Sequence, residues 1–117
     1  MNVTTNYSMV LNTEGVSGET VKVDFLNLKK AAMILRSLNH KLRQQILKLI
    51  DENKRLTVTE IYVRLRLEQS VASQHLAILR RAGIVKTTRD GKFIYYSINT
   101  ARVAYIMECV DRLNSPN

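Results

Sequence analysis

The clearest pattern of hydrophobic and polar positions in this chain lies between Glu68 and Gly83, where it predicts an amphipathic helix. At 100° per residue, one arc faces a core: Ala72, His75, Leu76, Leu79 and Ala82. The opposite arc holds small, hydrogen-bonding or basic residues: Ser70, Ser73, Gln74, Ala77 and Arg81. No acidic residue follows Glu68 within this helix, so the face suits contact with base edges and phosphates. Most polar helix faces, however, simply meet water.

A shorter helix is predicted just before this one. Thr57 and Glu60 have capping-box spacing, in which each residue's side chain binds the backbone amide of the other. Val58, Ile61 and Leu65 would bury the helix that follows. Three residues then lead to the next helix. A short helix, a tight turn and a second helix with a polar outer stripe form a helix-turn-helix, whose second helix enters the major groove of DNA.

Beyond Gly83, a predicted helix C-cap, β-branched and aromatic runs cover residues 84–89 and 92–98. The dipeptide Asp90-Gly91 between two such runs is a strong signal for a β-hairpin. The sequence therefore predicts a two-stranded wing directly after the helix-turn-helix.

Two more helices are predicted upstream, at 25–38 and 40–53. The first has an apolar arc too wide for one small core contact, which either a partner surface or burial between neighbouring elements would explain. The second begins after Asn39, its predicted N-cap, and looks like scaffold. Its inward positions are Leu42, Ile46, Leu49 and Ile50, and its outward positions are Lys41, Arg43 and Lys48.

A final helix, 99–113, starts at the predicted cap Asn99 and carries a long apolar stripe. This stripe is either packed on the domain or shared with a second subunit. The whole order of helix, helix, helix-turn-helix, hairpin and helix predicts a fold that is mainly α with a small β-hairpin (α+β), namely a winged helix-turn-helix. Residues 1–21 are polar and weakly periodic, so we expect a flexible N-terminal tail before a single DNA-binding and dimerisation domain at 22–117. A short strand or a second binding segment in the tail stays open.

The net charge of the chain limits which classes of partner this domain is expected to bind. The 117 residues carry a net charge of +8, with a pI near 9.9, which favours a polyanion. Nucleic acid ranks ahead of an anionic membrane because no long apolar run or basic amphipathic anchor is present. Basic charge that serves solubility alone is the competing interpretation. With Cys109 as the single cysteine and no secretory signal near the start, we expect a cytoplasmic protein.

From about Leu35 to Ile98 the sequence resembles the ArsR/SmtB family of bacterial repressors. Three segments carry the resemblance: Ser-Leu-Asn-His-Lys-Leu-Arg-Gln-Gln-Ile-Leu from Ser37, Ser-Val-Ala-Ser-Gln-His-Leu-Ala-Ile-Leu-Arg-Arg-Ala-Gly-Ile-Val from Ser70, and Gly-Lys-Phe-Ile-Tyr-Tyr-Ser-Ile from Gly91. The resemblance covers over half of the chain, and the terminal helices fit it in placement only.

The resemblance implies a homodimer, built from the first and last helices, on a two-fold DNA site near a promoter. The implied interface residues are Leu28, Ala31, Leu35, Val103, Ile106, Met107 and Val110. His75 becomes a helix-packing residue rather than a ligand. Arg66 occupies a turn position where the family commonly has glycine; if φ is positive there, the arginine costs about 1 kcal/mol.

Family members often release DNA when a metal binds, but the ligand positions do not match here. Thr57 and Thr59 stand where metal sensors carry Cys-x-Cys, and hydroxyls are not soft ligands. The ligand positions of zinc sensors along the last helix align with Thr100, Arg102, Leu113 and Pro116. We therefore expect no metal and no other cofactor, and the sequence does not indicate an effector. Cys109 is the one candidate redox residue, through an inter-subunit bridge or a modified thiol, against the alternative of a buried inert thiol.

Catalysis is not indicated, because His40 and His75 are the only histidines and no nucleophile motif or phosphate loop is present. We predict a sequence-specific DNA-binding regulator, a homodimeric repressor. The residues expected to face bases are Gln69, Ser70, Ser73 and Gln74. Those expected to contact phosphate or the minor groove are Arg80, Arg81, Arg89 and Lys92. The alternative is a winged-helix module for protein association, which needs neither an acid-free stripe nor cations at the wing tip.

Overall fold

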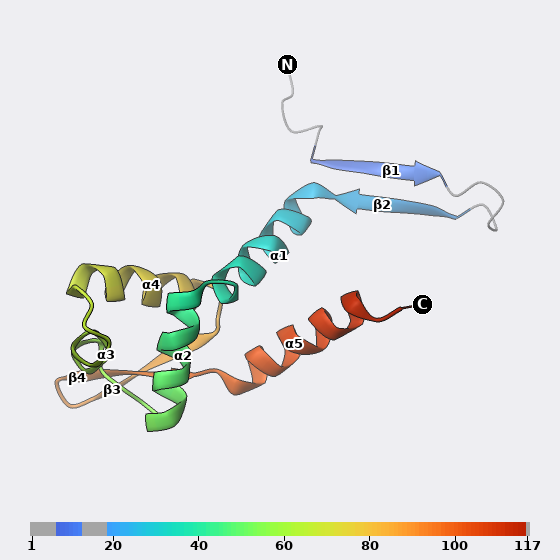
Figure 1. Cartoon of the computed structure of the whole chain (residues 1–117). Coiled ribbons are helices and arrows are strands. Elements are labelled where there is room, and N and C mark those ends of the chain that lie inside the picture. Colours follow the sequence, from blue (N-terminus) through green and yellow to red (C-terminus); the bar gives the residue numbers. More distant parts are fainter. Residues whose placement is uncertain (1–6, 13–18, 117) are drawn as a thin grey trace, which may run out of the picture. The chain divides into compact units, whose positions relative to one another are not determined.

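The computed structural model describes residues 7–12 and 19–116. Its elements follow one another in the order β1 (Ser8–Asn12), β2 (Thr20–Asp24), α1 (Phe25–Leu38), α2 (Lys41–Asn53), α3 (Val58–Leu65), α4 (Gln69–Arg81), β3 (Val85–Asp90), β4 (Phe93–Ile98) and α5 (Thr100–Asn114) (Figure 1). The chain divides into two units, Met1–Arg36 and Ser37–Asn117. The division falls within α1 rather than between residues 21 and 22, where the sequence places it.

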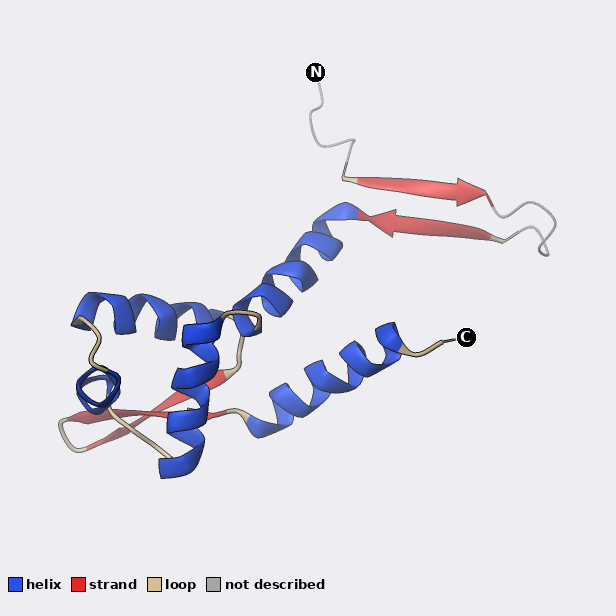
Figure 2. Cartoon of the chain, viewed as in Figure 1, coloured by secondary structure: helices blue, strands red, loops and turns tan. Residues whose placement is uncertain are grey.

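The second unit is built around one hydrophobic core. Helices α2, α3 and α4 pack on one another, and strand β4 packs on α2 and α3. The buried apolar side chains are Ile46, Ile50, Leu56, Ile61, Ala72, Leu76, Leu79, Ile84, Val85 and Ile106. Because they come from α2, α3, α4, β3, α5 and the connections between them, a single core holds the helices and the hairpin together. The predicted mainly α winged helix-turn-helix is confirmed (Figure 2).

Hydrogen bonds attach the wing to this core. Strands β3 and β4 pair in antiparallel register from Val85 with Ile98 to Asp90 with Phe93, so the two-residue loop is Gly91-Lys92. Leu56, in the α2–α3 connection, exchanges two backbone hydrogen bonds with Tyr96 of β4, at 3.0 and 2.7 Å. The wing is therefore held from the side by the start of the helix-turn-helix.

Two of the predicted helix caps are confirmed. The Thr57 hydroxyl accepts from the Glu60 amide at 3.2 Å while the Glu60 carboxylate accepts from the Thr57 amide at 3.0 Å. The Asn99 side chain accepts from the Arg102 amide at 3.2 Å. These local patterns needed no tertiary information, because each lies within four residues of sequence.

The start of α2 differs from its prediction in two ways. The N-cap is His40 rather than Asn39, since His40 has extended backbone and its Nδ1 accepts from the Arg43 amide at 3.4 Å. Arg43 was expected to face outward, yet it is buried, at 8 % exposure. Its Nε donates to the Ser37 carbonyl at 2.7 Å and its Nη1 lies 3.2 Å from Nδ1 of His75. Buried hydrogen-bond acceptors explain how this cation is tolerated inside the fold.

The first unit contains a hairpin where the sequence predicts a flexible tail. Strands β1 and β2 pair antiparallel, with Met9 opposite Val23 and Leu11 opposite Val21. The alternative of a short strand, left open above, is the one observed, at residues 8–12. Each strand is five residues long, and residues 13–19 between them contain Ser17-Gly18 but neither the Asn-Gly nor the Asp-Gly dipeptide of a two-residue hairpin loop. Pairing of this kind is non-local and leaves little trace in sequence periodicity.

Arg66 ends α3 in the left-handed conformation, with φ 56° and ψ 46°. Since this region costs a residue with a Cβ about 1–2 kcal/mol, we expect Arg66→Gly to raise the free energy of unfolding by about 1 kcal/mol in urea denaturation. Lys48→Gly, an exposed change within the regular helix α2, should instead lower it by about 1 kcal/mol. Equal destabilisation by both changes would contradict the strain at Arg66.

Candidate nucleic-acid interface

Helix α4 is divided between core and surface along its length. Ala72, Leu76 and Leu79 are fully buried, which fixes the rotation of the helix about its own axis. The four residues predicted to face bases are all exposed: Gln69, Ser70, Ser73 and Gln74. Within the described part of the chain, none of these four side chains makes a hydrogen bond. Their donors and acceptors are thus available to a ligand that lies along the helix.

The first turn of α4 is also open. Its N-cap residue, Glu68, has extended backbone but makes no side-chain capping hydrogen bond. The amides at the start of an α-helix have no partner within the helix, and they carry the positive end of its dipole. The amides at such an end can bind an anion such as phosphate, and in a helix-turn-helix the N-terminal residues of the second helix contact base edges. The amides of this first turn, like the exposed polar side chains of the same helix, are therefore available to a ligand.

The C-terminal half of α4 carries the predicted phosphate contacts. Arg80 and Arg81 are exposed, and with Ser73 and Ala77 they line a shallow surface hollow of about 420 Å³. The fifth lining residue is Tyr96 of β4, so the hollow connects the recognition helix to the wing. Sequence reasoning missed Tyr96, which alternation alone does not distinguish from the other wing aromatics. A hydroxyl beside two guanidinium groups suits a phosphate oxygen.

The wing tip holds the other predicted cations. Arg89 and Lys92 are exposed, and Arg89 Nε donates to the carbonyl of Gly91 at 3.2 Å. Gly91 has φ 62°, a value that suits glycine in a tight hairpin loop. The Lys92 ammonium lies 5.6 Å from the ring centroid of Phe93. Both cations therefore lie at the end of the hairpin.

Arg55 also contributes to the wing, although nothing in the local sequence marks it. Its guanidinium lies 3.2 Å from the Asp90 carboxylate and 3.9 Å from the ring centroid of Tyr95. The partners are 35 and 40 residues away along the chain, so only the fold brings them together. An exposed ion pair contributes little stability. Its position nevertheless restrains the wing tip and neutralises the one acid there, which would otherwise repel phosphate.

The imidazole rings of His40 and His75 and the guanidinium group of Arg43 lie together between α4 and the start of α2. The His40 and His75 ring centroids are 4.9 Å apart, and Arg43 Nη1 lies 3.2 Å from His75 Nδ1. This geometry agrees with the interpretation of His75 as a helix-packing residue. Burial lowers the pKa of the His75 imidazole, and the positive charges of His40 and Arg43 lower it further. His75 is thus suited to the neutral form, in which Nδ1 accepts from Arg43.

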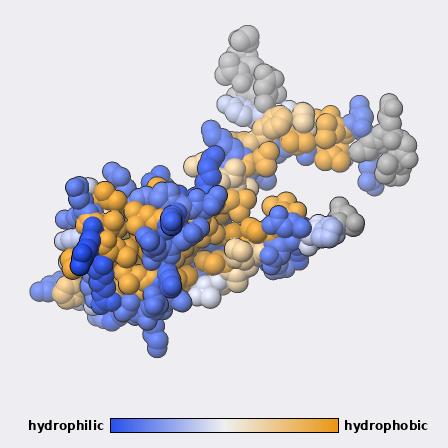
Figure 3. Space-filling model, viewed as in Figure 1, coloured by the Kyte–Doolittle hydropathy of each residue, from blue (hydrophilic) through white to orange (hydrophobic). Residues whose placement is uncertain are grey.

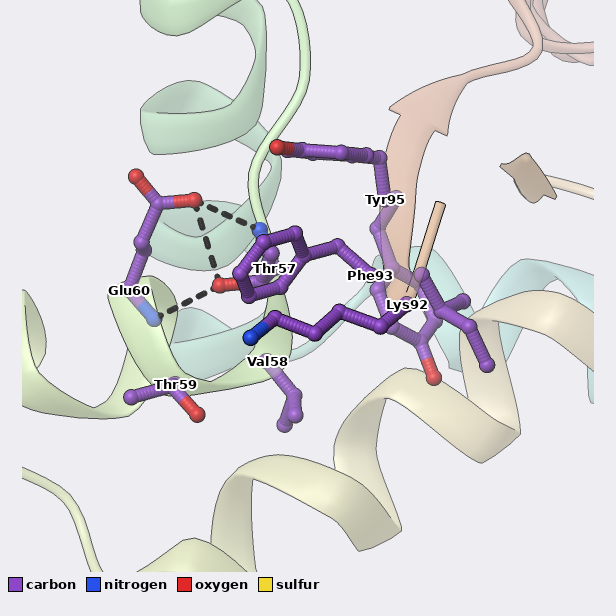
Figure 4. Close-up of a pocket in the computed structure, with 9 residues that line it drawn as sticks. Thr57, Val58, Thr59, Glu60, Lys92, Phe93 and Tyr95 are labelled. Carbon is purple, nitrogen blue, oxygen red and sulfur yellow. Dashed lines mark hydrogen bonds between the residues drawn. The ribbon is translucent and has the colours of Figure 1, made fainter. Parts of the chain in front are cut away.

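A larger hollow, of about 610 Å³, lies between the N-terminus of α3 and strand β4 (Figure 4). Phe93 and Lys92 lie across from the Thr57–Glu60 capping box in this view. The hydrogen bond from the Thr57 amide lowers the pKa of the Glu60 carboxyl against the opposing effect of burial, and the Thr57 hydroxyl and Arg64 lower it further. Because Glu60 and Thr57 already bind each other, this hollow offers few free polar groups to a ligand.

The residues at the metal-sensor positions do not fit a metal. The Thr57 hydroxyl is used in the cap of α3, and Arg102 Nε donates to the carbonyl of Ala82 at 3.4 Å. Among residues 7–12 and 19–116, no group of three or more His, Cys, Asp or Glu side chains could hold a metal ion. No helix in the described chain is long and apolar enough to cross a membrane.

The residues predicted at a dimer interface differ in accessibility. Leu28, Ala31, Leu35 and Met107 are exposed, and Val103 and Val110 are half-buried. Ile106 is only 5 % exposed, so it belongs to the protomer core and has little surface left for a partner. Within the apolar stripe of α5, Ile106 is therefore part of the core, whereas Val103, Met107 and Val110 remain at least partly accessible. Cys109 is a half-buried free thiol.

A helix-turn-helix with an exposed recognition face and an attached wing defines a winged helix-turn-helix protein of the nucleic-acid-binding class. Residues 40–87 match the model of the arsR family of bacterial regulatory proteins. The transcriptional activator HlyU of Vibrio cholerae is 38% identical over 87 residues, which cover 74% of this chain and 80% of HlyU. The transcriptional repressor PagR of Bacillus anthracis is 36% identical over 90 residues, which cover 77% of this chain and 90% of PagR.

Solved structures agree with these sequence matches. The crystal structure of PagR superimposes with a TM-score of 0.59, covering 74% of this chain and 99% of PagR at 36% identity. Reduced HlyU from Vibrio cholerae gives a TM-score of 0.56, covering 78% and 95% at 38% identity. The chain belongs to the ArsR family and is a DNA-binding transcriptional regulator, not an enzyme.

The lowered pKa of His75 predicts acid sensitivity of the fold. In the unfolded chain the imidazole titrates near 6.5, and in the folded chain it titrates lower. The unfolded state therefore binds more protons as the pH falls through about 6.5, so the free energy of unfolding decreases until the pH passes below the folded pKa. Urea denaturation at a series of pH values between about 7 and 5 measures this slope. His75→Gln should flatten it, and an identical slope in that variant would rule His75 out as its source.

Proposed function

We propose that this chain is a homodimeric repressor that reads a two-fold operator, with α4 in the major groove and the β3–β4 wing at the flank of each half-site. The observation that carries the proposal is the acid-free outer stripe of α4, which is exposed along its whole length and continues into Arg80 and Arg81. Its polar side chains are not used within the fold. A helix with this face satisfies the chemical needs of both base and phosphate contacts.

Within this interface the polar residues of α4 are assigned to the bases. Gln74 presents a paired donor and acceptor, which matches the edge of adenine in the major groove. Gln69, Ser70 and Ser73 lie on the same exposed face and accept or donate to several bases. Ala77 has a small side chain that permits close approach. These residues read sequence, whereas the arginines hold the helix in register.

The cations surround this reading face and are assigned to the backbone. Arg80 and Arg81 follow it along α4, and Tyr96 lies beside them in the shallow hollow. Arg89 and Lys92 extend the charge to the wing tip, where the minor groove or its phosphates would lie. The net charge of +8 supports this distribution.

The exposed apolar residues of the terminal helices support dimerisation. Leu28, Ala31 and Leu35 of α1 and Met107 of α5 are exposed to water, and Val103 and Val110 of α5 are half-buried. Two recognition helices one DNA turn apart would read half-sites about 34 Å apart. The relatives include both an activator and a repressor by name, and we place this chain with PagR, the repressor. The cytoplasm, where the DNA lies, is its expected compartment.

The protein-association alternative makes different predictions on DNA. The deciding experiment is binding of the purified protein to a labelled duplex from its own upstream region, against random duplex, over a salt series. Preference of about a thousandfold for the upstream duplex supports an autoregulatory repressor. Weak binding that is equal on many tested duplexes favours protein association.

The assigned roles predict two different mutant phenotypes. Gln74→Ala should lose on the order of 1–3 kcal/mol on operator DNA and almost nothing on random DNA, because it removes a base contact. Arg81→Ala should weaken binding to both and reduce the salt slope by about one, because it removes a phosphate contact. Lys48→Ala, a change of an exposed cation on α2, is the control and should leave both affinities unchanged. Identical behaviour of Gln74→Ala and Arg81→Ala on both duplexes would show that the roles are misassigned.

A further inference from the structure

The β1–β2 hairpin is amphipathic in a way that its sequence alone does not reveal. Paired residues of an antiparallel ladder share a face, as do alternate residues of one strand. One face therefore consists of Met9, Leu11, Val21 and Val23, all apolar. The other face consists of Ser8, Val10, Asn12, Thr20, Lys22 and Asp24. Apart from Val10, the second face is polar, and a division of this kind is typical of a sheet with one side in water and the other packed.

Among the described residues of the first unit, Val23 is half-buried and nothing covers the rest of that apolar face. Met9, Leu11 and Val21 are 44%, 45% and 49% exposed. No described residue from 7 to 36 is buried, although α1 also carries apolar side chains such as Leu28 and Met33. Hydrophobic surface is visible along the β1–β2 hairpin (Figure 3). Of the sixteen large hydrophobic residues exposed in the described chain, ten lie in this stretch. An isolated two-stranded hairpin is marginally stable in water, so this unit needs another surface to complete a core.

The hairpin is joined directly to α1. Strand β2 ends at Asp24 and α1 begins at Phe25, with no linker between them. The Phe25 amide donates to the Tyr7 carbonyl at 2.5 Å, and the Asp24 carboxylate accepts from the Asn27 amide at 3.0 Å. These hydrogen bonds fix the hairpin to the first turn of the helix. Any partner that covers α1 therefore meets the hairpin as part of the same body.

The chemistry of the face limits what that partner is. The charged residues of the hairpin strands, Lys22 and Asp24, lie on the opposite face and have opposite signs. The apolar face therefore offers no attraction to DNA phosphates or anionic lipid headgroups. It requires a protein surface that is equally apolar. Regulators of this family typically form dimers, and α1 of a second copy offers exposed Leu28, Met33 and Leu35.

We infer that the apolar face of the β1–β2 hairpin is a dimerisation element that packs on the N-terminal unit of a second copy of this chain. The inference rests on the dimer of the proposed function and extends its interface from the helices to the hairpin. Each protomer contributes Met9, Leu11, Val21 and Val23, so the two-fold symmetric contact contains every one of these side chains twice. The hairpin then gains the core that its own unit lacks.

The test measures the dimer dissociation constant of the full chain by sedimentation equilibrium without DNA. Leu11→Ser should raise that constant by about a hundredfold, since a lost leucine contact is worth about tenfold and occurs twice. The matched control is Val10→Ser, which changes the next residue of the same strand, is 59% exposed and lies on the opposite face. It should leave the constant unchanged. Wild-type affinity in both variants would overturn the hairpin inference while leaving a helix-mediated dimer intact.

A second measurement works on the wild-type chain and requires no variant to fold. In a mixture of isotope-labelled and unlabelled protomers, filtered NOE spectra report only contacts between copies. We expect such NOEs from the methyl groups of Leu11 and Val21. Methyl contacts confined to one chain would overturn the inference. A wild-type chain that stays monomeric at all concentrations would overturn both the inference and the proposed dimer, and the DNA assay separately tests operator recognition.

Discussion

The structure depends on the burial of one side of α4. Ala72, Leu76 and Leu79 enter the core that α2 and α3 share, and each fully buried leucine contributes about 2–3 kcal/mol. Because that apolar stripe sets the rotation of the helix, the residues between its members must point to solvent. The recognition face is therefore a geometric consequence of core packing. Any change that rotated α4 would move the exposed Gln74 and Ser73 out of the position proposed for them in the major groove, along with the leucines.

The polar connections around α4 position its surroundings rather than the helix itself. The Leu56–Tyr96 bridge fixes the wing to the helix-turn-helix, and Arg55 restrains the wing tip at Asp90. At the other end, Arg43 and His75 join α4 to α2. These links are individually weak or local. Together they hold the cations of the wing and of α4 on one unit, which is what a surface that binds a continuous phosphate backbone requires.

The two units of the chain differ in how far they bury their own hydrophobic side chains. The second has a core of its own, and its exposed polar face is free for recognition. The first has an amphipathic hairpin and a helix with apolar side chains but no buried residue among those described. In physical terms the first unit is incomplete, and the same hydrophobic effect that organises the winged helix favours its association with another surface. In the proposed dimer, recognition lies on the second unit, whereas assembly uses the first unit together with α5 of the second.

The sequence by itself determined the features that are local or periodic. The 3.6-residue period placed α4 and its exposed stripe. The Thr57–Glu60 capping box marked the start of α3, Asp90-Gly91 marked the wing, and Asn99 marked the start of α5. Only the tertiary structure decided what depends on residues distant along the chain. Arg43 is buried because His75 and Ser37 accept its hydrogen bonds, and Ile106 belongs to the protomer core. Likewise β1 and β2 are strands because they pair with each other, which neither five-residue segment could specify alone.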